Sequence, residues 1–111
     1  MRDDRERLAD ILDACERAQR IVAKGEEHVR TGDEAQLALV HLIQIMGEAA
    51  TQLRSEFRHA HAEVPWREVA GMRNQVVHRY FDVDLDVVWD ISTTDVPRLA
   101  EQVQKMLDET S

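Results

Sequence analysis

The sequence predicts an all-α protein, a bundle of about five helices in which two long helices form an antiparallel pair. Hydrophobic residues make up 43% of the 111 residues and charged residues 32%, with only four glycines and two prolines. Such a composition is typical of a compact helical domain. Apolar residues also recur at three- and four-residue steps, which is the spacing of one helix face. At this length the chain fits one domain, residues 1–111, with a hydrophobic core of its own.

The first predicted helix runs from about Asp3 or Asp4 to Lys24, with acids at its start and Gly25 as its end. Its apolar stripe consists of Leu8, Ile11, Leu12, Cys15, Ala18, Ile21 and Val22. The polar segment 26–32 is expected to close with Thr31-Gly32-Asp33, a turn followed by a helix cap. Cys15 is the only cysteine, and within the stripe we interpret it as a buried structural thiol.

The second predicted helix runs from about Asp33 to Ala60 and packs on the first. Its stripe consists of Leu39, Leu42, Ile43, Met46, Ala50, Leu53 and Phe57. Further apolar residues, Leu37, Val40, Ile45 and Ala49, extend well beyond that stripe. A helix that is apolar over so much of its circumference must be buried from more than one side, and a homodimer sharing this helix would do so. Glu48 lies inside this run, either as an exposed acid at the helix edge or as a charge partner for Arg73 or His78.

Val64-Pro65 breaks the chain, and the third helix is predicted from about Pro65 to His78 or Tyr80. The acids of Asp82-Val83-Asp84-Leu85-Asp86 lack the accompanying residues of a nucleotidyltransferase or calcium-binding loop. We interpret them as a turn and the cap of a short fourth helix near Asp84 to Ile91. Residues 92–95 are expected to form a second capped entry, and Val96-Pro97 opens the fifth helix.

Chemically useful side chains are densest in Arg73-Asn74-Gln75-Val76-Val77-His78-Arg79-Tyr80. A histidine can exchange a proton near neutrality, and a guanidinium offers forked donors that match phosphate oxygens. On an ideal helix Asn74 and His78 share one face, and Arg73 and Tyr80 share another. Arg73 and His78 could then meet one substrate if the arginine reaches around, if the helix frays near His78, or if a second copy contributes its own motif. The spacing therefore hints at a dimer.

The net charge of −8 argues against a general nucleic-acid binder, and we expect no DNA partner. Residues 51–80, however, hold 3 acids and 5 bases and are the only positive third of the chain. An enzyme that grips one or two phosphates fits this distribution, and the acidic remainder suits a basic protein partner. His41, Gln44 and Glu48 interrupt the apolar stretches, so we expect no membrane span and a soluble cytoplasmic protein. His59 and His61 lack further ligands, so no metal or other cofactor is expected.

Residues outside the motif strengthen a family resemblance. They are the run from Val64-Pro65-Trp66 to Met72, the segment Ile45-Met46-Gly47-Glu48-Ala49-Ala50, and Val87-Val88-Trp89. Together with the arginine, four residues, histidine, one residue, tyrosine pattern, they resemble the HepT-like branch of the HEPN superfamily over most of the chain. The resemblance implies a dimeric, metal-independent endoribonuclease toxin that cleaves RNA and is paired with a nucleotidyltransferase-like antitoxin.

Carried onto this chain, the resemblance implies that Arg73 and His78 are the catalytic pair and that Asn74 positions them. Glu48 and Arg79 are candidate binding or modulating residues. Tyr80 corresponds to a tyrosine to which the antitoxin can transfer AMP, although it could equally be a core aromatic with its hydroxyl at the surface. The alternative function is a non-catalytic module that binds a nucleotide or presents substrate to a separate nucleotidyltransferase.

Overall fold

The computed structural model describes residues 3–78 and 82–109, and only the backbone of His78. The described elements, in chain order, are α1 (Asp4–Val22), α2 (Glu26–Thr31), α3 (Asp33–Gln52), α4 (Ser55–Ala60), α5 (Trp66–Gln75), β1 (Val77–His78), β2 (Asp82–Val83), α6 (Leu85–Asp90), the π-helix η1 (Ile91–Asp95) and α7 (Val96–Glu109). The fold is therefore the predicted all-α bundle, with one short antiparallel hairpin added. None of the described helices is both long and apolar enough to cross a membrane.

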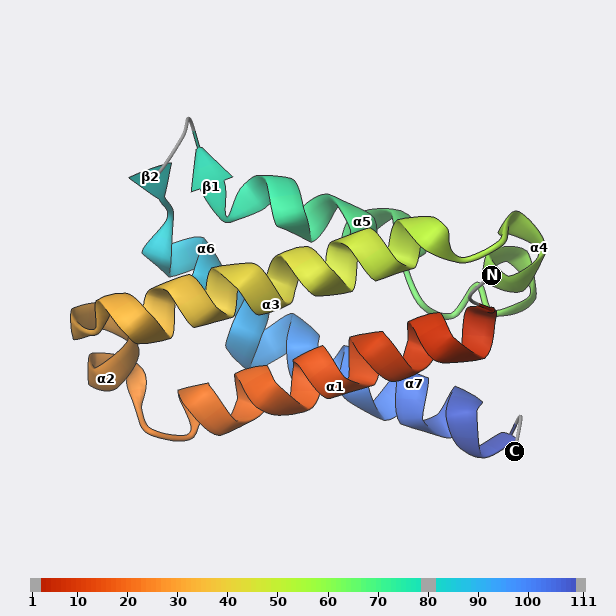
Figure 1. Cartoon of the computed structure of the whole chain (residues 1–111), viewed down its shortest axis with the longest axis horizontal. Helices are drawn as coiled ribbons and strands as arrows, with labels where there is room; N and C mark the ends of the chain where they lie inside the picture. The colour runs from red at the N-terminus through yellow and green to blue at the C-terminus, as the bar shows by residue number, and fades with distance from the viewer. Residues whose placement is uncertain (1–2, 79–81, 110–111) are drawn as a thin grey trace.

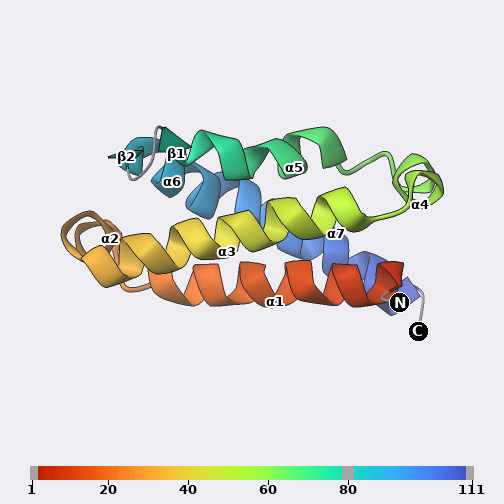
Figure 2. The same ribbon diagram turned by 45° about the horizontal axis from the view of Figure 1, so that its top comes forward.

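The two long helices, α1 and α3, lie side by side and run in opposite directions (Figure 1). From a tilted viewpoint α1, α3 and α5 form successive layers, and α7 lies against α1 (Figure 2). The start of α1 and the end of α7 meet at one end of the bundle, where the Arg5 guanidinium donates to the carbonyl of Leu107 at 3.1 Å. The predicted antiparallel helix pair is thus confirmed, and α3 is placed between α1 and α5.

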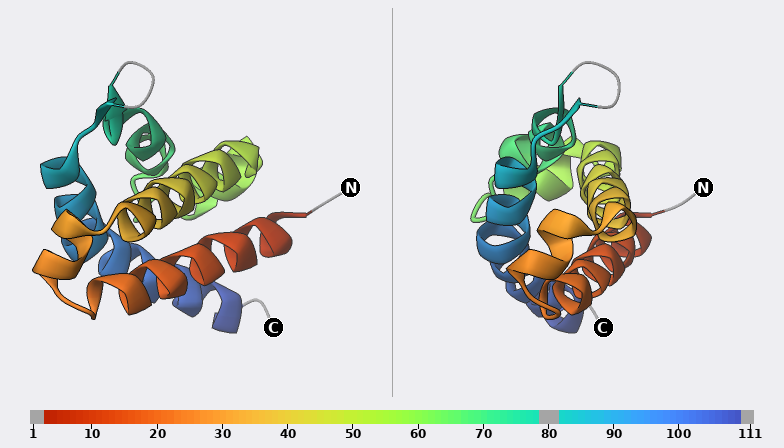
Figure 3. Two further views of the ribbon diagram at one scale, coloured as in Figure 1. Left: turned by 60° about the vertical axis from the view of Figure 1, so that its left-hand side comes forward. Right: turned by 90° about the vertical axis from the view of Figure 1, so that its left-hand side faces the viewer.

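Seen along the bundle, the helices surround one core (Figure 3). The predicted apolar stripes supply much of it: Leu8, Ile11, Cys15 and Ala18 from α1, and Leu39, Ile43, Met46 and Ala50 from α3. Val40 and Ala49, which we expected to need a second copy for their burial, are buried within one chain. Among the described large apolar side chains only Leu37 is well exposed, at 65%. The apolar circumference of α3 is therefore mostly covered without a dimer.

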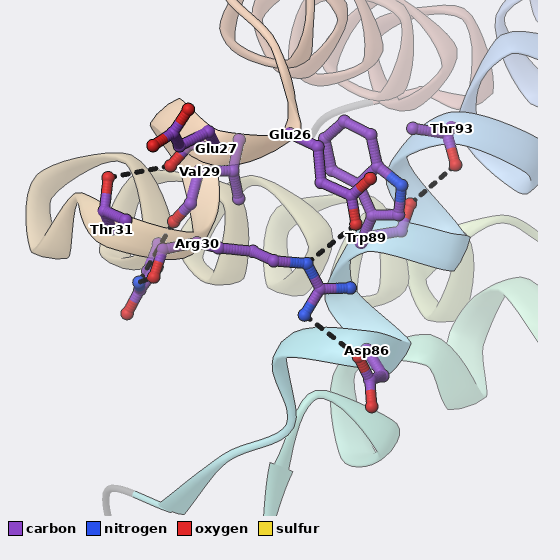
Figure 4. Close-up of polar contacts among 9 residues, drawn as sticks. Glu26, Glu27, Val29, Arg30, Thr31, Asp86, Trp89 and Thr93 are labelled. Atoms are coloured by element: carbon purple, nitrogen blue, oxygen red, sulfur yellow. Dashed lines mark hydrogen bonds and ion pairs between the residues drawn. The ribbon is translucent and has the colours of Figure 1, made fainter.

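No helix was predicted within the polar segment 26–32, whereas residues 26–31 form α2, and only Gly32 of the predicted turn 31–33 lies outside a helix. Gly25 precedes the helix with φ of 107°, a conformation that suits glycine. Val29 is buried, and the Arg30 guanidinium lies between Glu26 of its own helix and Asp86 of α6 (Figure 4). One buried apolar residue is too little to produce a recognisable apolar stripe. Contacts with neighbouring helices therefore stabilise α2, and its sequence pattern does not predict it.

The single helix predicted over 33–60 was also wrong, since α3 ends at Gln52 and α4 begins at Ser55. Leu53 and Arg54 are extended, with ψ of 141° and 147°. Asp4 of α1 accepts hydrogen bonds from the Arg54 backbone N–H at 3.1 Å and from its guanidinium at 2.7 Å. The side chain of Asp4 is only 9% exposed. The break is therefore set by a buried carboxylate that lies 50 residues away in the chain.

The α6, η1 and α7 segments form one continuous helical run. The predicted cap at Asp84 is confirmed, because its side chain accepts from the backbone N–H of Val87 at 3.2 Å. The predicted second entry at 92–95 was wrong, because these residues form a π-turn in which the Val96 N–H donates to the carbonyl of Ile91. Proline usually breaks a helix by clashing with the preceding turn. The wider π-turn lies directly before Pro97, where it lets the helix continue.

Candidate active site

Arg73 lies in the last turn of α5, where that helix crosses close to α3. The crossing point on α3 is Gly47. A Cβ added at Gly47 would lie 3.1 Å from the carbonyl oxygen of Ala70 and 3.2 Å from the Cβ of Arg73. These are tighter contacts than side chains normally make, so the absence of a side chain at Gly47 allows the two helices to approach. The stem of Arg73 therefore rests directly on α3.

The guanidinium of Arg73 forms an ion pair with the carboxylate of Glu48, the residue after Gly47. The other carboxylate oxygen of Glu48 accepts from Gln52 at 3.3 Å. The side chain of Arg73 is 35% exposed and that of Glu48 61%. Among the described side chains, Arg73 makes no other hydrogen bond. A guanidinium has five N–H donors, so most of the donors of Arg73 have no partner among the described side chains.

An open groove of about 410 Å³ runs over this ion pair. One wall is a single face of α3, and the other is formed by Arg73 and Asn74 of α5. The α3 residues that line it are His41, Gln44, Ile45 and Glu48. Asn74 is exposed beside Arg73, so an amide and a guanidinium reach the same solvent-filled space. The structure thus brings together three of the predicted site residues, Arg73, Asn74 and Glu48.

Sequence reasoning did not place His41, Gln44 or Ile45 in the site. Their positions relative to Glu48, seven, four and three residues earlier, put all four on one helix face. That spacing was visible in the sequence, but it becomes meaningful only when α5 is known to pack beside the same face. The helix crossing at Gly47 supplies that information.

The prediction that His78 continues the third helix was wrong. The α5 helix ends at Gln75, and residues 77–78 form β1, which pairs with β2 in the register Val77 to Val83 and His78 to Asp82. The N–H of Asp84 also donates to the carbonyl of Val76 at 2.9 Å. Val76 and Val77 are β-branched and favour an extended backbone, and β2 provides hydrogen-bond partners for it. Asn74 and His78 therefore do not share a helix face.

The turned chain places the backbone of His78 in the hairpin that follows Arg73. The side chain of His78 and all of Arg79 and Tyr80 lie outside the described residues. Their predicted roles stay predictions. The hairpin does establish that Arg73 and His78 belong to two different elements, α5 and β1. This agrees with the alternative in which the helix ends before His78.

A second cavity, of about 290 Å³, lies on the other side of α5, against α7. It is lined by Pro65, Glu68, Val69, Met72, Gln75, Asp95, Arg98, Leu99 and Gln102. Partial burial and the nearby carboxylate of Glu68 raise the pKa of Asp95 above its ordinary value. Of the predicted site residues that the structure describes with their side chains, Arg73, Asn74 and Glu48 line the groove beside α3 and none lines this cavity.

Cys15 is fully buried in α1, as its place in the apolar stripe predicted. Burial, with a smaller contribution from the charge of Glu16, raises the pKa of its thiol to about 12. A thiol with such a pKa stays protonated near neutral pH and is a poor nucleophile. Cys15 is therefore part of the core.

Fold and groove together define a small all-α protein with a partly exposed arginine and an exposed asparagine beside an open groove. The family model described as "Ribonuclease HepT-like" matches residues 11–106. The chain belongs to this HepT-like ribonuclease family.

Three relatives whose names describe them as ribonucleases match nearly the whole chain. A protein of Caldanaerobacter subterraneus subsp. tengcongensis, provisionally named an RNase, is 35% identical over 96% of this chain and 96% of its own length. A protein of Thermococcus cleftensis, provisionally named ribonuclease HepT, is 32% identical over 95% of this chain and 96% of its own. A Methanocaldococcus jannaschii protein, named a gamma-glutamylcyclotransferase and provisionally an RNase, is 35% identical over 92% of this chain but only 46% of its own length. No solved structure matches the chain.

Proposed function

We propose that this protein is an endoribonuclease that cleaves RNA in the groove between α3 and α5, with Arg73 and His78 as the catalytic pair. The observation that carries the proposal is the placement of Arg73. Its guanidinium is partly exposed over the groove, next to Asn74, and holds only one carboxylate partner among the described side chains. Family membership and the names of the relatives support RNA as the substrate.

The proposed reaction is a transesterification within the RNA strand. The ribose 2′-oxygen attacks the adjacent phosphorus, its proton passes to a base, and the bond from phosphorus to the 5′-oxygen breaks as that oxygen takes up a proton. The products are a 2′,3′-cyclic phosphate and a free 5′-hydroxyl. His78 can remove the first proton or deliver the second, because imidazole does both near neutral pH. Arg73 stabilises the charge that grows on the phosphoryl oxygens in the transition state.

Other residues of the groove prepare this step. Asn74 can hold a phosphate oxygen or the imidazole of His78 through its amide. Glu48 competes with the substrate phosphate for Arg73, so it modulates binding and holds the guanidinium in place when RNA is absent. Arg79 supplies a further positive charge for the RNA backbone. None of these steps requires a metal ion, because a general acid-base group and a guanidinium account for both proton transfer and charge stabilisation.

We propose that the active form is a homodimer in which two copies place their motifs at a shared cleft. The wide apolar circumference of α3 no longer supports this well, because Val40 and Ala49 are buried within one chain. The support comes instead from the exposed Leu37 and from the open groove, to which a second copy could add its own motif. Sedimentation of purified protein tests the dimer directly, and a monomer that cleaves RNA at full rate would refute it.

The activity is tested with purified protein, a mixed RNA pool and the same sequences as single-stranded DNA, all in EDTA. We expect cleavage of RNA alone, because DNA lacks the attacking 2′-hydroxyl. The RNA products should end in 2′,3′-cyclic phosphate, and His78→Ala should abolish their formation while unfolding like wild type. Cleavage that appears only when a divalent metal is added back, or that extends to DNA, would contradict the mechanism.

We also propose that the protein is the toxin of a toxin-antitoxin pair whose antitoxin is a nucleotidyltransferase-like protein that transfers AMP to Tyr80. The acidic remainder of the chain suits a basic partner, and an anionic adduct in the same motif as Arg73 would compete with RNA for the guanidinium. The test is intact mass after coexpression with the product of a neighbouring nucleotidyltransferase gene. An unmodified mass, or the same adduct on Tyr80→Phe, would refute the assignment.

A non-catalytic module that binds a nucleotide or a partner is the alternative. One observation favours it: Arg73 is already paired with Glu48, and a phosphate need only displace that carboxylate to be held. The two functions differ in what single substitutions do. Variants at Arg73 and His78 that still bind RNA but no longer cut it would establish the nuclease, whereas a wild-type protein that binds nucleotide and never cuts RNA would establish the module.

A further inference from the structure

The groove extends beyond Arg73 along the face of α3. From Glu48 back to His41 this face covers seven residues, or about 10 Å along the helix axis. Gln44 and Ile45 lie between them and line the same groove. The groove is thus longer than the space needed to hold one phosphate at Arg73.

The two polar side chains on this extension are available for binding. His41 and Gln44 are both exposed, and neither makes a hydrogen bond or ion pair with a described residue. Ile45, beside them, is half-buried and gives the groove an apolar floor. A planar imidazole, an amide and an apolar floor are the components with which proteins hold an unpaired base, by stacking on its face and hydrogen bonding to its edge.

The position of Arg73 indicates which part of an RNA strand would lie over His41 and Gln44. If Arg73 holds the phosphate that is cut, the groove offers the strand a path from that phosphate along α3 toward His41. Glu48 repels a phosphate at its own position, but His41 and Gln44 carry no negative charge. An unpaired base next to the cut phosphate therefore finds a suitable surface on α3.

We propose that His41 and Gln44 form a subsite for the unpaired nucleobase that flanks the cut phosphate, with His41 stacking on the base and Gln44 reading its edge. This inference rests on the proposed ribonuclease function, since it takes Arg73 as the phosphate site. It assigns substrate selection to α3 and charge stabilisation to α5. Neither residue is needed for proton transfer.

The first arm of the test maps cut sites in a random-sequence RNA pool for wild type, His41→Ala and Gln44→Ala. The matched controls are His59→Ala and Gln104→Ala, which remove the same side chains from exposed positions on α4 and α7. We expect the base preference at one flanking position to flatten in both groove variants. Loss of a stacking contact should raise KM about 5- to 100-fold, with a much smaller change in kcat. The controls should keep the wild-type pattern.

The second arm measures binding of a non-cleavable 2′-O-methyl RNA oligonucleotide, so that the subsite and the nuclease can fail separately. Weaker binding by both groove variants supports the subsite even if wild type never cuts RNA, in which case only the proposed function fails. Wild-type base preference, KM and oligonucleotide affinity in both variants would overturn the subsite while leaving the nuclease intact. A fall in dimer stability without a change in base preference would also overturn it, because α3 would then be an interface between copies.

Discussion

Arg30 and Arg73 have almost the same exposure, 37% and 35% of the side chain, yet the structure uses them differently. Arg30 donates to Glu26 at 2.7 Å and to Asp86 at 3.0 Å, and so joins α2 to α6 (Figure 4). These hydrogen bonds raise its pKa above the ordinary value. Arg73 has one carboxylate partner, Glu48, and the groove lies over its remaining donors.

This difference shows that an ion pair does not by itself distinguish a structural arginine from a functional one. Two carboxylates on separate helices occupy Arg30 on both sides. Within the part of the chain that the structure describes, Arg73 is held by Glu48 alone, and next to it an asparagine reaches the same open space. The number of partners and the groove, rather than exposure, mark Arg73 as the group that can bind phosphate.

Outside the proposed catalytic pair, the largest effect should come from Gly47→Ala, which changes the surface on which Arg73 rests. The new Cβ would meet the backbone of Ala70 and the Cβ of Arg73, so α5 must shift. We expect overpacking to cost about 1–3 kcal/mol, offset in part by the better helix propensity of alanine. RNA cleavage should fall at least about tenfold, because misplacement of a catalytic group is expensive.

Gly71→Ala is the matched control for this substitution, because it makes the same change in α5. A Cβ at Gly71 meets no atom within 4 Å. We expect this variant to be more stable than wild type by about 0.5–1 kcal/mol and to cleave RNA normally. Urea unfolding and cleavage rates measure both effects. If Gly47→Ala behaves like Gly71→Ala, the close crossing does not position Arg73.

A smaller effect is expected from breaking the ion pair between Arg54 and the buried carboxylate of Asp4, and it concerns stability rather than cleavage. Burial opposes the charge on Asp4, but its hydrogen bonds from Arg54 prevail and lower its pKa below the ordinary 3.8. Because the pKa of Asp4 is lower in the folded than in the unfolded chain, its carboxylate stabilises the fold at any pH above the unfolded-state pKa. This stabilisation is lost as the pH falls through the folded-state pKa. We expect Asp4→Ala to lower the free energy of unfolding by about 1–2 kcal/mol at neutral pH.

The control for Asp4→Ala is the pH dependence of its loss in the free energy of unfolding. Urea unfolding should show a difference from wild type at pH 7 that disappears in strong acid, where Asp4 is protonated in both folded and unfolded chains. RNA cleavage at neutral pH should be unchanged. A cost that persists undiminished in acid would mean that Asp4 stabilises the break after α3 by packing rather than by charge.

Glu48→Gln removes the one partner that Arg73 has among the described residues, and it should have a modest effect. Exposed ion pairs are worth about 0.2–1 kcal/mol, so releasing Arg73 for phosphate should lower KM roughly 1.5- to 5-fold. Glu101→Gln, which removes the same charge from the exposed face of α7, is the control and should change KM less. A large loss of kcat in Glu48→Gln would instead give Glu48 a direct part in catalysis.

Much of the fold was predictable because local periodicity decides it. The stripes of α1 and α3 identified both long helices and most of their buried residues. The interruptions were not predictable, because distant residues cause them. Leu53 and Phe57 continue the apolar stripe of α3 in the sequence, although the helix is broken where Asp4 accepts from Arg54. Val76 and Val77 lie beyond the end of α5, and Val77 belongs to β1, which pairs with β2. The short α2 lacked a stripe altogether.

The site was predictable in part for the same reason. Arg73 and Asn74 stand out in the sequence, and Glu48 is conspicuous inside an apolar run. His41 and Gln44 interrupt that run as well, and the sequence alone indicated only that it could not be a membrane span. Their place in the groove depends on the helix crossing at Gly47, and that crossing is a property of tertiary packing, which residue spacing does not encode.

One pair of variants separates Arg73, which we propose acts on RNA, from Arg30, which joins two helices. We would measure cleavage of the same RNA in EDTA by Arg73→Ala and Arg30→Ala, after urea unfolding has shown both to be folded. We expect a loss of about 10²- to 10³-fold in kcat for Arg73→Ala and a change of less than about twofold for Arg30→Ala. Equal losses in the two variants, or none in Arg73→Ala, would contradict this proposal.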